Sequence, residues 1–330
     1  MENRTFSRLG RTVGVIGLGA WQLGADWGDV SEADAHATLQ AAVDSGVTFI
    51  DTADVYGDGR SEQIIGSFIK RFQSADGPQL TVATKMGRRM AQEVGNYTLD
   101  NFRAWTDRSR ANLGVDTLDL VQLHCPPTPV FSAGEVYDAL DTLVEEKRIR
   151  AYGVSVEKVD EALAAIARPG TASVQIILNA LRLKPLERVL PAAEEAGVGI
   201  IARVPLASGL LSGRYDENTT FAADDHRNYN RQGAAFDVGE TFSGVDFAIG
   251  LEAVRRLRPL VPAGATMAQF ALRWILDQPG VTVAIPGARN SSQAEGNAAA
   301  AGLAPLPAES LAAVTAVYDE LIRPQVHDKW

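Results

Sequence analysis

The stretch Leu118-Asp119-Leu120-Val121-Gln122-Leu123 runs directly into His124, so a short, largely apolar segment ends at an ionisable side chain. Two earlier apolar segments have the same form and end at Asp51 and Lys85, and Tyr56 follows Asp51 in the next loop. Short apolar runs of this kind favour buried strands. If the strands are parallel, their carboxyl ends lie on one face of a sheet or barrel. The sequence therefore predicts that the four side chains meet in one pocket.

Segments with helical spacing alternate with the apolar runs along the chain. Ser31, Thr98 and Thr266 are placed as helix N-caps, while Pro185 and Gly197 mark the start and the stop of another helix. The predicted strands begin at Val13, Thr48, Leu80, Leu118, Ile149, Ser173, Val198 and Val281. Strands that alternate with helices indicate βαβ units and a parallel sheet.

Eight such units in 330 residues predict an α/β fold, a single (β/α)8 TIM barrel over residues 1–330. The polar residues 213–244 are interpreted as a long active-site loop. A doubly wound open sheet is the structural alternative. Its dinucleotide signature is incomplete, because Gly17-Leu18-Gly19 is followed by Gln22 where a third glycine is needed. This glycine pair is therefore interpreted as a tight turn after a strand.

Charge and composition exclude several classes of function. The formal net charge of −10 opposes binding to a phosphate backbone, so we expect no nucleic-acid partner. No apolar run is long enough for a membrane span, and residues 1–4 lack the apolar core of a signal peptide. The single cysteine, Cys125, has no internal disulfide partner. We expect a cytoplasmic protein, and its oligomeric state is left open. The four histidines have no spacing typical of a metal site, so we expect none.

The chemistry of the predicted pocket points to proton transfer. An isolated phenol has a pKa of about 10, which is high for acid–base work near neutral pH. An ammonium such as Lys85 beside Tyr56 favours the phenolate and lowers that pKa. Asp51 would keep Lys85 charged and in place, and His124 would orient the substrate. The sequence predicts Tyr56 as a proton donor.

Four motifs resemble those of the aldo-keto reductases, in the same order along the chain. Residues 46–57 look like the first family signature, and residues 82–85 and 119–124 look like the lysine and histidine segments. Residues 285–297 look like the nucleotide-binding segment. The resemblance covers nearly the whole chain. It implies an NADPH-dependent oxidoreductase that reduces aldehyde or ketone carbonyls of small molecules.

The resemblance also implies which residues hold NADP(H). Ser155 and Gln175 would bind the nicotinamide carboxamide, and Trp21, after Ala20, would lie beside the nicotinamide ribose or the substrate. Arg289 would meet the 2′-phosphate and Arg214 another phosphate, which favours NADP over NAD. The remaining implied contacts are Asp51 and Arg203 near the nicotinamide, Pro205, Leu206, Ser208, Gly209 and Leu211 at the pyrophosphate, and Gly287, Gln293 and Asn297 at the adenosine. Residues 205–213 are similar to the same segment in one branch of the family, which contains bacterial and potassium-channel-β-subunit-like members.

Two positions depart from the family pattern. Val156 stands after Ser155 where the family usually has asparagine, so one hydrogen bond to the carboxamide is lost or is made elsewhere. Arg203 stands where many members have an aromatic ring that stacks on the nicotinamide. A lone guanidinium there would repel an oxidised ring, so the sequence predicts a preference for the reduced cofactor.

Two other functions remain open at this point. Lys85 at a strand end is placed for a Schiff base, as in a class I aldolase or similar lyase, although Asp51 would keep the amine protonated. A non-catalytic, cofactor-binding regulatory subunit is the other alternative. The substrate depends on the long loops, and aldehydes, dicarbonyls, quinones and sugars all remain open. Asp26, Trp27, Asp54 and Trp330 are further candidates for the pocket entrance.

Overall fold

The computed structural model describes residues 1–24, 30–72 and 79–330, so the entrance candidates Asp26 and Trp27 lie outside the described residues. Its main sheet has eight parallel strands in the order β10-β9-β8-β7-β6-β5-β4-β3. These strands are β3 (Leu18–Gly19), β4 (Phe49–Asp51), β5 (Thr81–Met86), β6 (Leu118–His124), β7 (Ile149–Ser155), β8 (Thr171–Ile177), β9 (Gly199–Arg203) and β10 (Val281–Ala284). Each neighbour in the sheet is also a neighbour in the sequence, as in a barrel.

The two edges of this sheet meet and close it. Parallel bridges join Ile16 to Ala284 and Gly19 to Gly287. The Gly17 N–H donates to the Ala284 carbonyl at 2.8 Å. A Cβ at Gly17 would lie 2.9 Å from the Phe49 carbonyl oxygen, so only glycine fits this close approach. The predicted (β/α)8 barrel is confirmed, and the glycine pair belongs to its seam.

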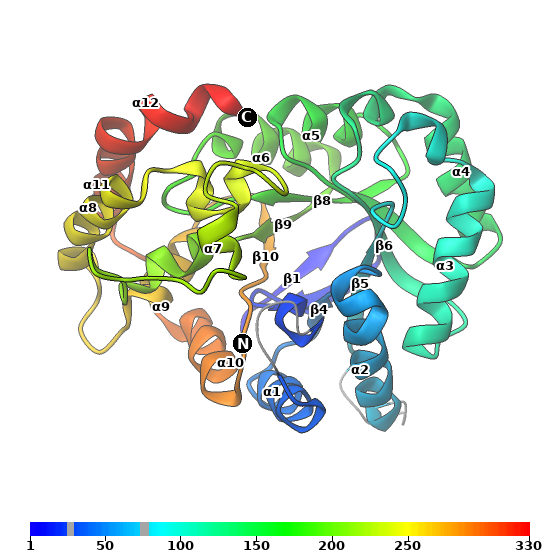
Figure 1. The fold of residues 1–330 in the computed structure, drawn as a ribbon, viewed down its shortest axis with the longest axis horizontal. Helices are drawn as coiled ribbons and strands as arrows, with labels where there is room; N and C mark the ends of the chain where they lie inside the picture. Colours follow the sequence, from blue (N-terminus) through cyan, green and yellow to red (C-terminus); the bar gives the residue numbers. More distant parts are fainter. Residues whose placement is uncertain (25–29, 73–78) are drawn as a thin grey trace.

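Helices cover the outside of the barrel (Figure 1). The helix that follows each strand, in order from β3 to β8, is α1 (Glu32–Asp44), α2 (Arg60–Ile69), α3 (Leu99–Leu113), α4 (Gly134–Glu145), α5 (Val159–Ile166) and α6 (Pro185–Ala196). After β9 and β10 come α7 (His226–Tyr229), α8 (Phe247–Leu257), α9 (Met267–Leu276), α10 (Ser291–Ala298), α11 (Ala308–Val317) and α12 (Arg323–Val326). Among the described residues, no helix has both the length and the apolar character that a bilayer crossing needs.

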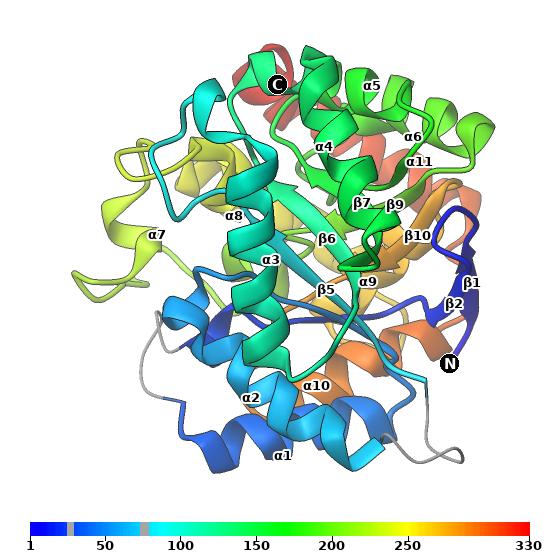
Figure 2. The same cartoon turned by 90° about the vertical axis from the view of Figure 1, so that its right-hand side faces the viewer.

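The N-terminal residues form a hairpin that corrects one predicted strand. β1 (Asn3–Phe6) pairs antiparallel with β2 (Arg11–Gly14), and Val13 belongs to this hairpin, not to the barrel. The turn at Gly10, with φ of +66°, folds β2 back onto β1. The first barrel strand is therefore β3. Figure 2 shows the hairpin at one end of the barrel and α7 at the other.

Side-chain alternation along the strands arranges the barrel interior in layers. An inner apolar cluster includes Phe49, Ala83, Leu120, Ala151 and Ile201, and Phe6, Leu9 and Val13 add to it from the hairpin. Successive strand residues point to opposite faces, so the residue two positions further on points inward again. Four of these five positions hold Asp51, Lys85, Gln122 and Arg203, all buried, and the fifth, in β7, is Gly153. A polar layer thus lies above the apolar one, toward the carboxyl ends of the strands.

Several predicted helix ends are confirmed. The Asp34 N–H donates to the Ser31 hydroxyl at 3.1 Å, and Gly197 ends α6 with φ of +68°. Thr266 forms a capping box at the start of α9. The main omission is α8, which lies in a region predicted to be irregular. Its apolar residues Ala253, Val254 and Leu257 pack against the core, and tertiary burial decides its structure.

Candidate active site

Lys85 is the centre of the predicted tetrad. Its Nζ donates to Asp51 Oδ2 at 2.5 Å, to the Thr52 carbonyl at 2.8 Å and to the Tyr56 hydroxyl at 3.3 Å. The side chain of Lys85 is 1% exposed, so the ion pair with Asp51 is shielded from solvent. Three acceptors use the three N–H groups of an ammonium. β4, β5 and the loop after β4 therefore bring these groups together as the sequence predicts.

Burial and charge act in opposite directions on the two titratable partners. Burial lowers the pKa of Lys85, but Asp51 and Tyr56 together raise it above its ordinary value, so the ammonium is retained. For Tyr56, burial raises the pKa above 10 and outweighs the lowering by Lys85. The sequence predicted that Lys85 lowers the pKa of Tyr56, but the net shift of this pKa is upward. Tyr56 is therefore a neutral phenol at neutral pH, with a proton to give.

His124 completes the group at the end of β6. Its ring lies edge-on to the Tyr56 ring, with centroids 6.0 Å apart. Burial, followed by the charges of Arg88 and Lys85, holds the pKa of His124 well below its usual value. Nδ1 is buried and has no hydrogen-bond partner among the described residues. A neutral imidazole here can orient a carbonyl oxygen without carrying a charge.

Gln122 is a member of the site that sequence reasoning missed. Its Nε2 donates to Asp51 Oδ1 at 3.1 Å, and Gln175 Nε2 donates to the same oxygen at 2.7 Å. Gln122 Oε1 also accepts from Gln175 at 3.2 Å. Both Asp51 oxygens are thus occupied, which fixes the carboxylate that holds Lys85. A polar residue two positions before His124, on the same strand face, was the available signal.

Aromatic side chains form one wall beside Tyr56. The Trp21 ring stacks on the Tyr56 ring with centroids 5.9 Å apart and an interplanar angle of 20°. His226 and Phe236, from the long loop after β9, lie against the same indole at 5.7 and 6.1 Å. Ala20, just before Trp21, is fully buried, and its N–H donates to the Asp51 carbonyl at 2.8 Å. Trp21 is therefore placed beside the tetrad.

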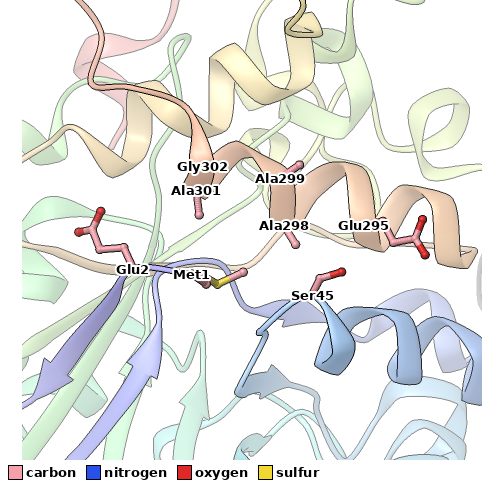
Figure 3. Close-up of a pocket in the computed structure, with 8 residues that line it drawn as sticks. All are labelled: Met1, Glu2, Ser45, Glu295, Ala298, Ala299, Ala301 and Gly302. Carbon is pink, nitrogen blue, oxygen red and sulfur yellow. The ribbon is translucent and has the colours of Figure 1, made fainter.

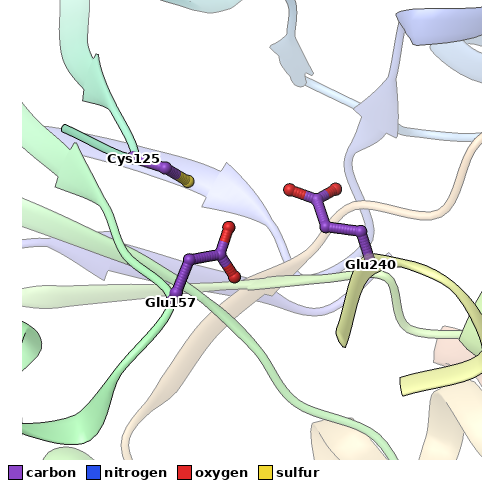
Figure 4. Close-up of side chains that lie close together, drawn as sticks. All are labelled: Cys125, Glu157 and Glu240. Atoms are coloured by element: carbon purple, nitrogen blue, oxygen red, sulfur yellow. The ribbon is translucent and has the colours of Figure 1, made fainter. Parts of the chain in front are cut away.

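The ends of β6, β7 and β9 carry a second group of charges. Arg203 donates to Glu157 Oε2 at 2.8 Å and to the Val156 carbonyl at 3.0 Å, and it pairs with Glu240 at 3.1 Å. Figure 4 shows Cys125, Glu157 and Glu240 facing one another. Possible ligand atoms of these three residues lie within 4.8 Å of one another. Because Arg203 already pairs with both carboxylates, a cation occupies the place that a metal ion would take.

The two carboxylates of this cluster have different proton affinities. Burial raises the pKa of Glu157 to about 7, against the lowering by Arg203. Burial also raises the pKa of Glu240, but Arg203 and Arg88 bring it below its ordinary value. Burial raises the pKa of the Cys125 thiol to about 12, so Cys125 is not a thiolate nucleophile. We call Glu157, Arg203 and Glu240 the charged triad.

The segment after β9 has an unusual backbone at the predicted pyrophosphate positions. Val204, Ala207 and Ser208 have φ values of +52°, +46° and +55°, and Gly209 has +89°. The Ser208 hydroxyl donates to the Glu240 carbonyl at 2.9 Å and accepts from the Phe242 N–H at 3.1 Å. Ser208 thus ties this turn to the loop that carries Glu240. Of the other predicted positions here, Leu211 is buried, Leu206 is half-buried, Arg214 is exposed and Pro205 lies between β9 and the turn.

The predicted adenosine positions lie between β10 and α10. Asn297 Nδ2 donates to the Gly287 carbonyl at 3.1 Å, and Gln293 Oε1 accepts from the Arg289 N–H at 2.9 Å. Both amides therefore hold the backbone of this turn, while Arg289 is exposed. Asn290 caps α10 by accepting from the Gln293 N–H at 3.0 Å. The start of α10 and a guanidinium are thus adjacent, which suits a phosphate.

A hollow of about 470 Å³ lies elsewhere on the molecule (Figure 3). It is lined by Met1, Glu2, Ser45, Glu295, Ala298, Ala299, Ala301 and Gly302. These residues belong to the N-terminus and to the ends of α1 and α10. None of them belongs to the tetrad or to the charged triad, so the hollow is separate from the candidate active site.

The long loop after β9 brings residues to the site that sequence reasoning did not assign to it. Glu240 and Asp237 come from this loop, and Trp330 holds it, because Trp330 Nε1 donates to Asp237 Oδ1 at 3.0 Å. The Arg182 guanidinium lies 3.4 Å from the centre of the Trp330 ring. Trp330, a candidate for the pocket entrance, is 6% exposed and packs against this loop. Acidic residues in a polar loop carry no spacing signal that would have found Glu240.

Comparisons with known proteins agree with this geometry. Residues 15–319 match the model of the aldo/keto reductase family. The aldo-keto reductase YhdN of Bacillus subtilis is 32% identical over 298 residues, which cover 89% of this chain and 87% of that protein. The aldo-keto reductase yakc of Schizosaccharomyces pombe, whose name carries NADP(+), is 29% identical and covers 87% of this chain and 83% of its own length.

A solved structure with the same fold is the glycerol dehydrogenase of Gluconobacter oxydans. It superposes with a TM-score of 0.78 at 28% identity and covers 98% of this chain and 96% of its own. The family model alone spans far more than half of the chain, and it matches the strands that carry Asp51, Lys85 and His124. The chain belongs to the aldo-keto reductase family.

Proposed function

We propose that this protein is an NADPH-dependent oxidoreductase that reduces aldehyde or ketone carbonyls to alcohols. The observation that carries the proposal is the Tyr56 hydroxyl held 3.3 Å from the Lys85 ammonium, which Asp51 in turn holds at 2.5 Å. A neutral phenol beside a fixed ammonium is suited to give a proton and to be left as a stabilised phenolate. We further propose that residues 1–330 act as one catalytic domain.

The residues of the site divide the work of such a reduction. Bound NADPH would supply the hydride to the carbonyl carbon. Tyr56 would give a proton to the carbonyl oxygen, while Lys85 stabilises the phenolate that remains. The neutral His124 would orient the carbonyl oxygen toward Tyr56. Trp21, stacked on Tyr56, would exclude water from one side of the reacting group.

The polar atoms around the site fit a nicotinamide dinucleotide. His124 Nδ1, Glu157 Oε1 and Arg203 Nε are buried and lack hydrogen-bond partners among the described residues. Ser155 and Gln175 lie side by side on paired strands, as the predicted carboxamide contact requires. The exposed Arg289 beside the start of α10 would meet the 2′-phosphate. The NADP(+) in the name of the yeast relative supports the same choice of cofactor.

Two alternatives are less well supported. A Schiff-base lyase needs a neutral amine at Lys85, but all three N–H groups have acceptors and the pKa of Lys85 is raised. A non-catalytic regulatory subunit would need the cofactor site and not the proton donor. The complete tetrad favours an active enzyme over that subunit.

The first experiment is a fluorescence titration of the purified protein with NADPH and then with NADH. We expect tighter binding of NADPH. Aldehydes, ketones and sugars, together with dihydroxyacetone as the ketone related to glycerol, would then be screened by loss of NADPH absorbance. Tyr56→Phe is the control, and we expect it to bind NADPH normally with kcat at least about 100-fold lower.

Each outcome separates the candidates. Binding of neither cofactor would overturn both the reductase and the regulatory subunit. Binding without turnover of any carbonyl would favour the regulatory subunit. Retained turnover in Tyr56→Phe would exclude Tyr56 as the proton donor. Trapping of Lys85 by borohydride in the presence of a carbonyl substrate would instead support the Schiff-base lyase.

A further inference from the structure

We propose that Glu157 and Glu240, through their pairing with Arg203, set the relative affinity of this site for oxidised and reduced nicotinamide. The two carboxylates would favour the oxidised, positively charged ring. This inference rests on the proposed function, because it assumes a nicotinamide cofactor near Ser155, Gln175 and Arg203. It opposes the preference for reduced cofactor that Arg203 alone predicts from the sequence.

The geometry of the charged triad carries the proposal. Arg203 is almost fully buried at the end of β9, and its guanidinium pairs with Glu157 at 2.8 Å and with Glu240 at 3.1 Å. The side chains of Glu157 and Glu240 are 13% and 12% exposed, so solvent screens them little. Oε1 of Glu157 is buried and has no partner among the described residues. Arg203 therefore does not use the whole carboxylate.

The charge balance gives the direction of the effect. One guanidinium and two ionised carboxylates give the triad a net charge of −1. Arg182 and Asp237 meet at Trp330 and offset each other. Arg88, which donates to the His124 carbonyl at 3.2 Å, adds a positive charge that acts on both carboxylates and balances the triad. Removal of either triad carboxylate therefore makes the surroundings of Arg203 more positive.

The same charges bear on the reaction itself. Bound NADPH would gain positive charge on its nicotinamide ring when it gives up hydride. The two carboxylates would stabilise that charge in a buried site, where electrostatic effects are large. They would also hold the oxidised product more firmly. Glu157 and Glu240 are thus assigned as determinants of the cofactor's redox state at this site.

The test is a pair of dissociation constants for each variant. NADPH binding is followed by nicotinamide fluorescence, and NADP⁺ binding by competition against NADPH, at pH 8. We expect Glu157→Gln and Glu240→Gln each to lower the affinity for NADP⁺ by about tenfold relative to that for NADPH. Glutamine keeps the size and the hydrogen-bond acceptor of glutamate. Circular dichroism and thermal unfolding would show that each variant is folded.

A matched control comes from the surface. Glu252 on α8 is bonded to Arg255 and Arg256 but belongs to neither charged group of the site, and Glu252→Gln should leave the ratio unchanged. An unchanged ratio in both folded triad variants would overturn the proposal while leaving the proposed function intact. A ratio that moves toward NADP⁺ would overturn it as well. Absence of binding of either cofactor to the unaltered protein would overturn the proposed function and this inference together.

Discussion

The two charged groups of the site are built in different ways. Asp51 and Lys85 come from neighbouring barrel strands, and strand alternation alone directs both side chains inward. In the charged triad, Arg203 ends a strand, but Glu240 comes from the long loop that follows this strand. The first group is fixed by the barrel itself. The second exists only while the loop lies in place.

The difference indicates which properties each group controls. A buried pair held by the scaffold suits a step that requires constant geometry, such as proton transfer from Tyr56. A pair closed by a loop suits the binding and release of a cofactor, since the loop can move without disturbing the barrel. The following predictions test this division.

Asp51→Asn should give the largest effect. It leaves the Lys85 ammonium buried with no anionic partner, so we expect about 3–5 kcal/mol less stability and a loss of kcat of at least about 100-fold. Urea unfolding and steady-state kinetics measure the two quantities. The control is Asp58→Asn, because Asp58 pairs with Arg89 and Arg108 but is 78% exposed. Comparable losses in both variants would contradict the special role of burial.

The second prediction concerns pH and the charged triad. Burial raises the pKa of Glu157 to about 7, so its carboxylate is neutral below that pH and ionised above it. Ionisation adds a negative charge, and the affinity for NADP⁺ relative to NADPH should therefore rise by several-fold from pH 6 to pH 8. The groups that face Glu157 are Arg203, Glu240, Asp237, Cys125, Arg182 and Arg88.

Other titrations must be separated from this one. Burial raises the pKa of Asp54 to about 7 as well, and Asp54 interacts electrostatically with Lys85. The cofactor 2′-phosphate titrates near pH 6 in both redox forms, so it cancels in the ratio. Glu157→Gln should flatten the pH dependence of the ratio. If the slope survives in this variant, Glu157 is not its source.

A smaller effect is expected from Trp330. Trp330→Ala removes the hydrogen bond to Asp237 and the ring that covers Gly239 and Gly244, so the loop segment that carries Glu240 loses its support. We expect NADPH to bind about fivefold more weakly, with kcat little changed. Trp330→Phe should be intermediate, because it keeps a ring for Arg182. Proteolysis within residues 213–244 gives an independent measure of loop opening, and an unchanged Kd would argue against this support.

The sequence allowed the barrel and the tetrad to be predicted for a common reason. Each apolar run that ends in Asp51, Lys85 or His124 predicts a strand. Side-chain alternation along that strand then predicts that its last side chain points into the barrel. Helix starts such as Ser31 and Thr266 were readable from their capping chemistry. In each case the information lies within a few neighbouring residues.

What could not be predicted depends on contacts between distant residues. Val13 has the alternation of a strand, but only its pairing with Arg4 shows that the strand is antiparallel. Arg203 looks like an isolated cation until Glu240 is brought to it from the long loop. The net pKa of Tyr56 follows from burial, which no local motif reveals. Loop positions and burial are properties of the folded chain.

The hairpin β1–β2 has a kinetic consequence. Phe6, Leu9 and Val13 close the barrel at the end opposite the tetrad. The cofactor and the substrate would therefore both enter and leave at the carboxyl ends of the strands. A dinucleotide bound at that end would form part of the surface that a small carbonyl substrate then contacts. Steady-state kinetics should therefore follow a compulsory order, with the nucleotide first to enter and last to leave.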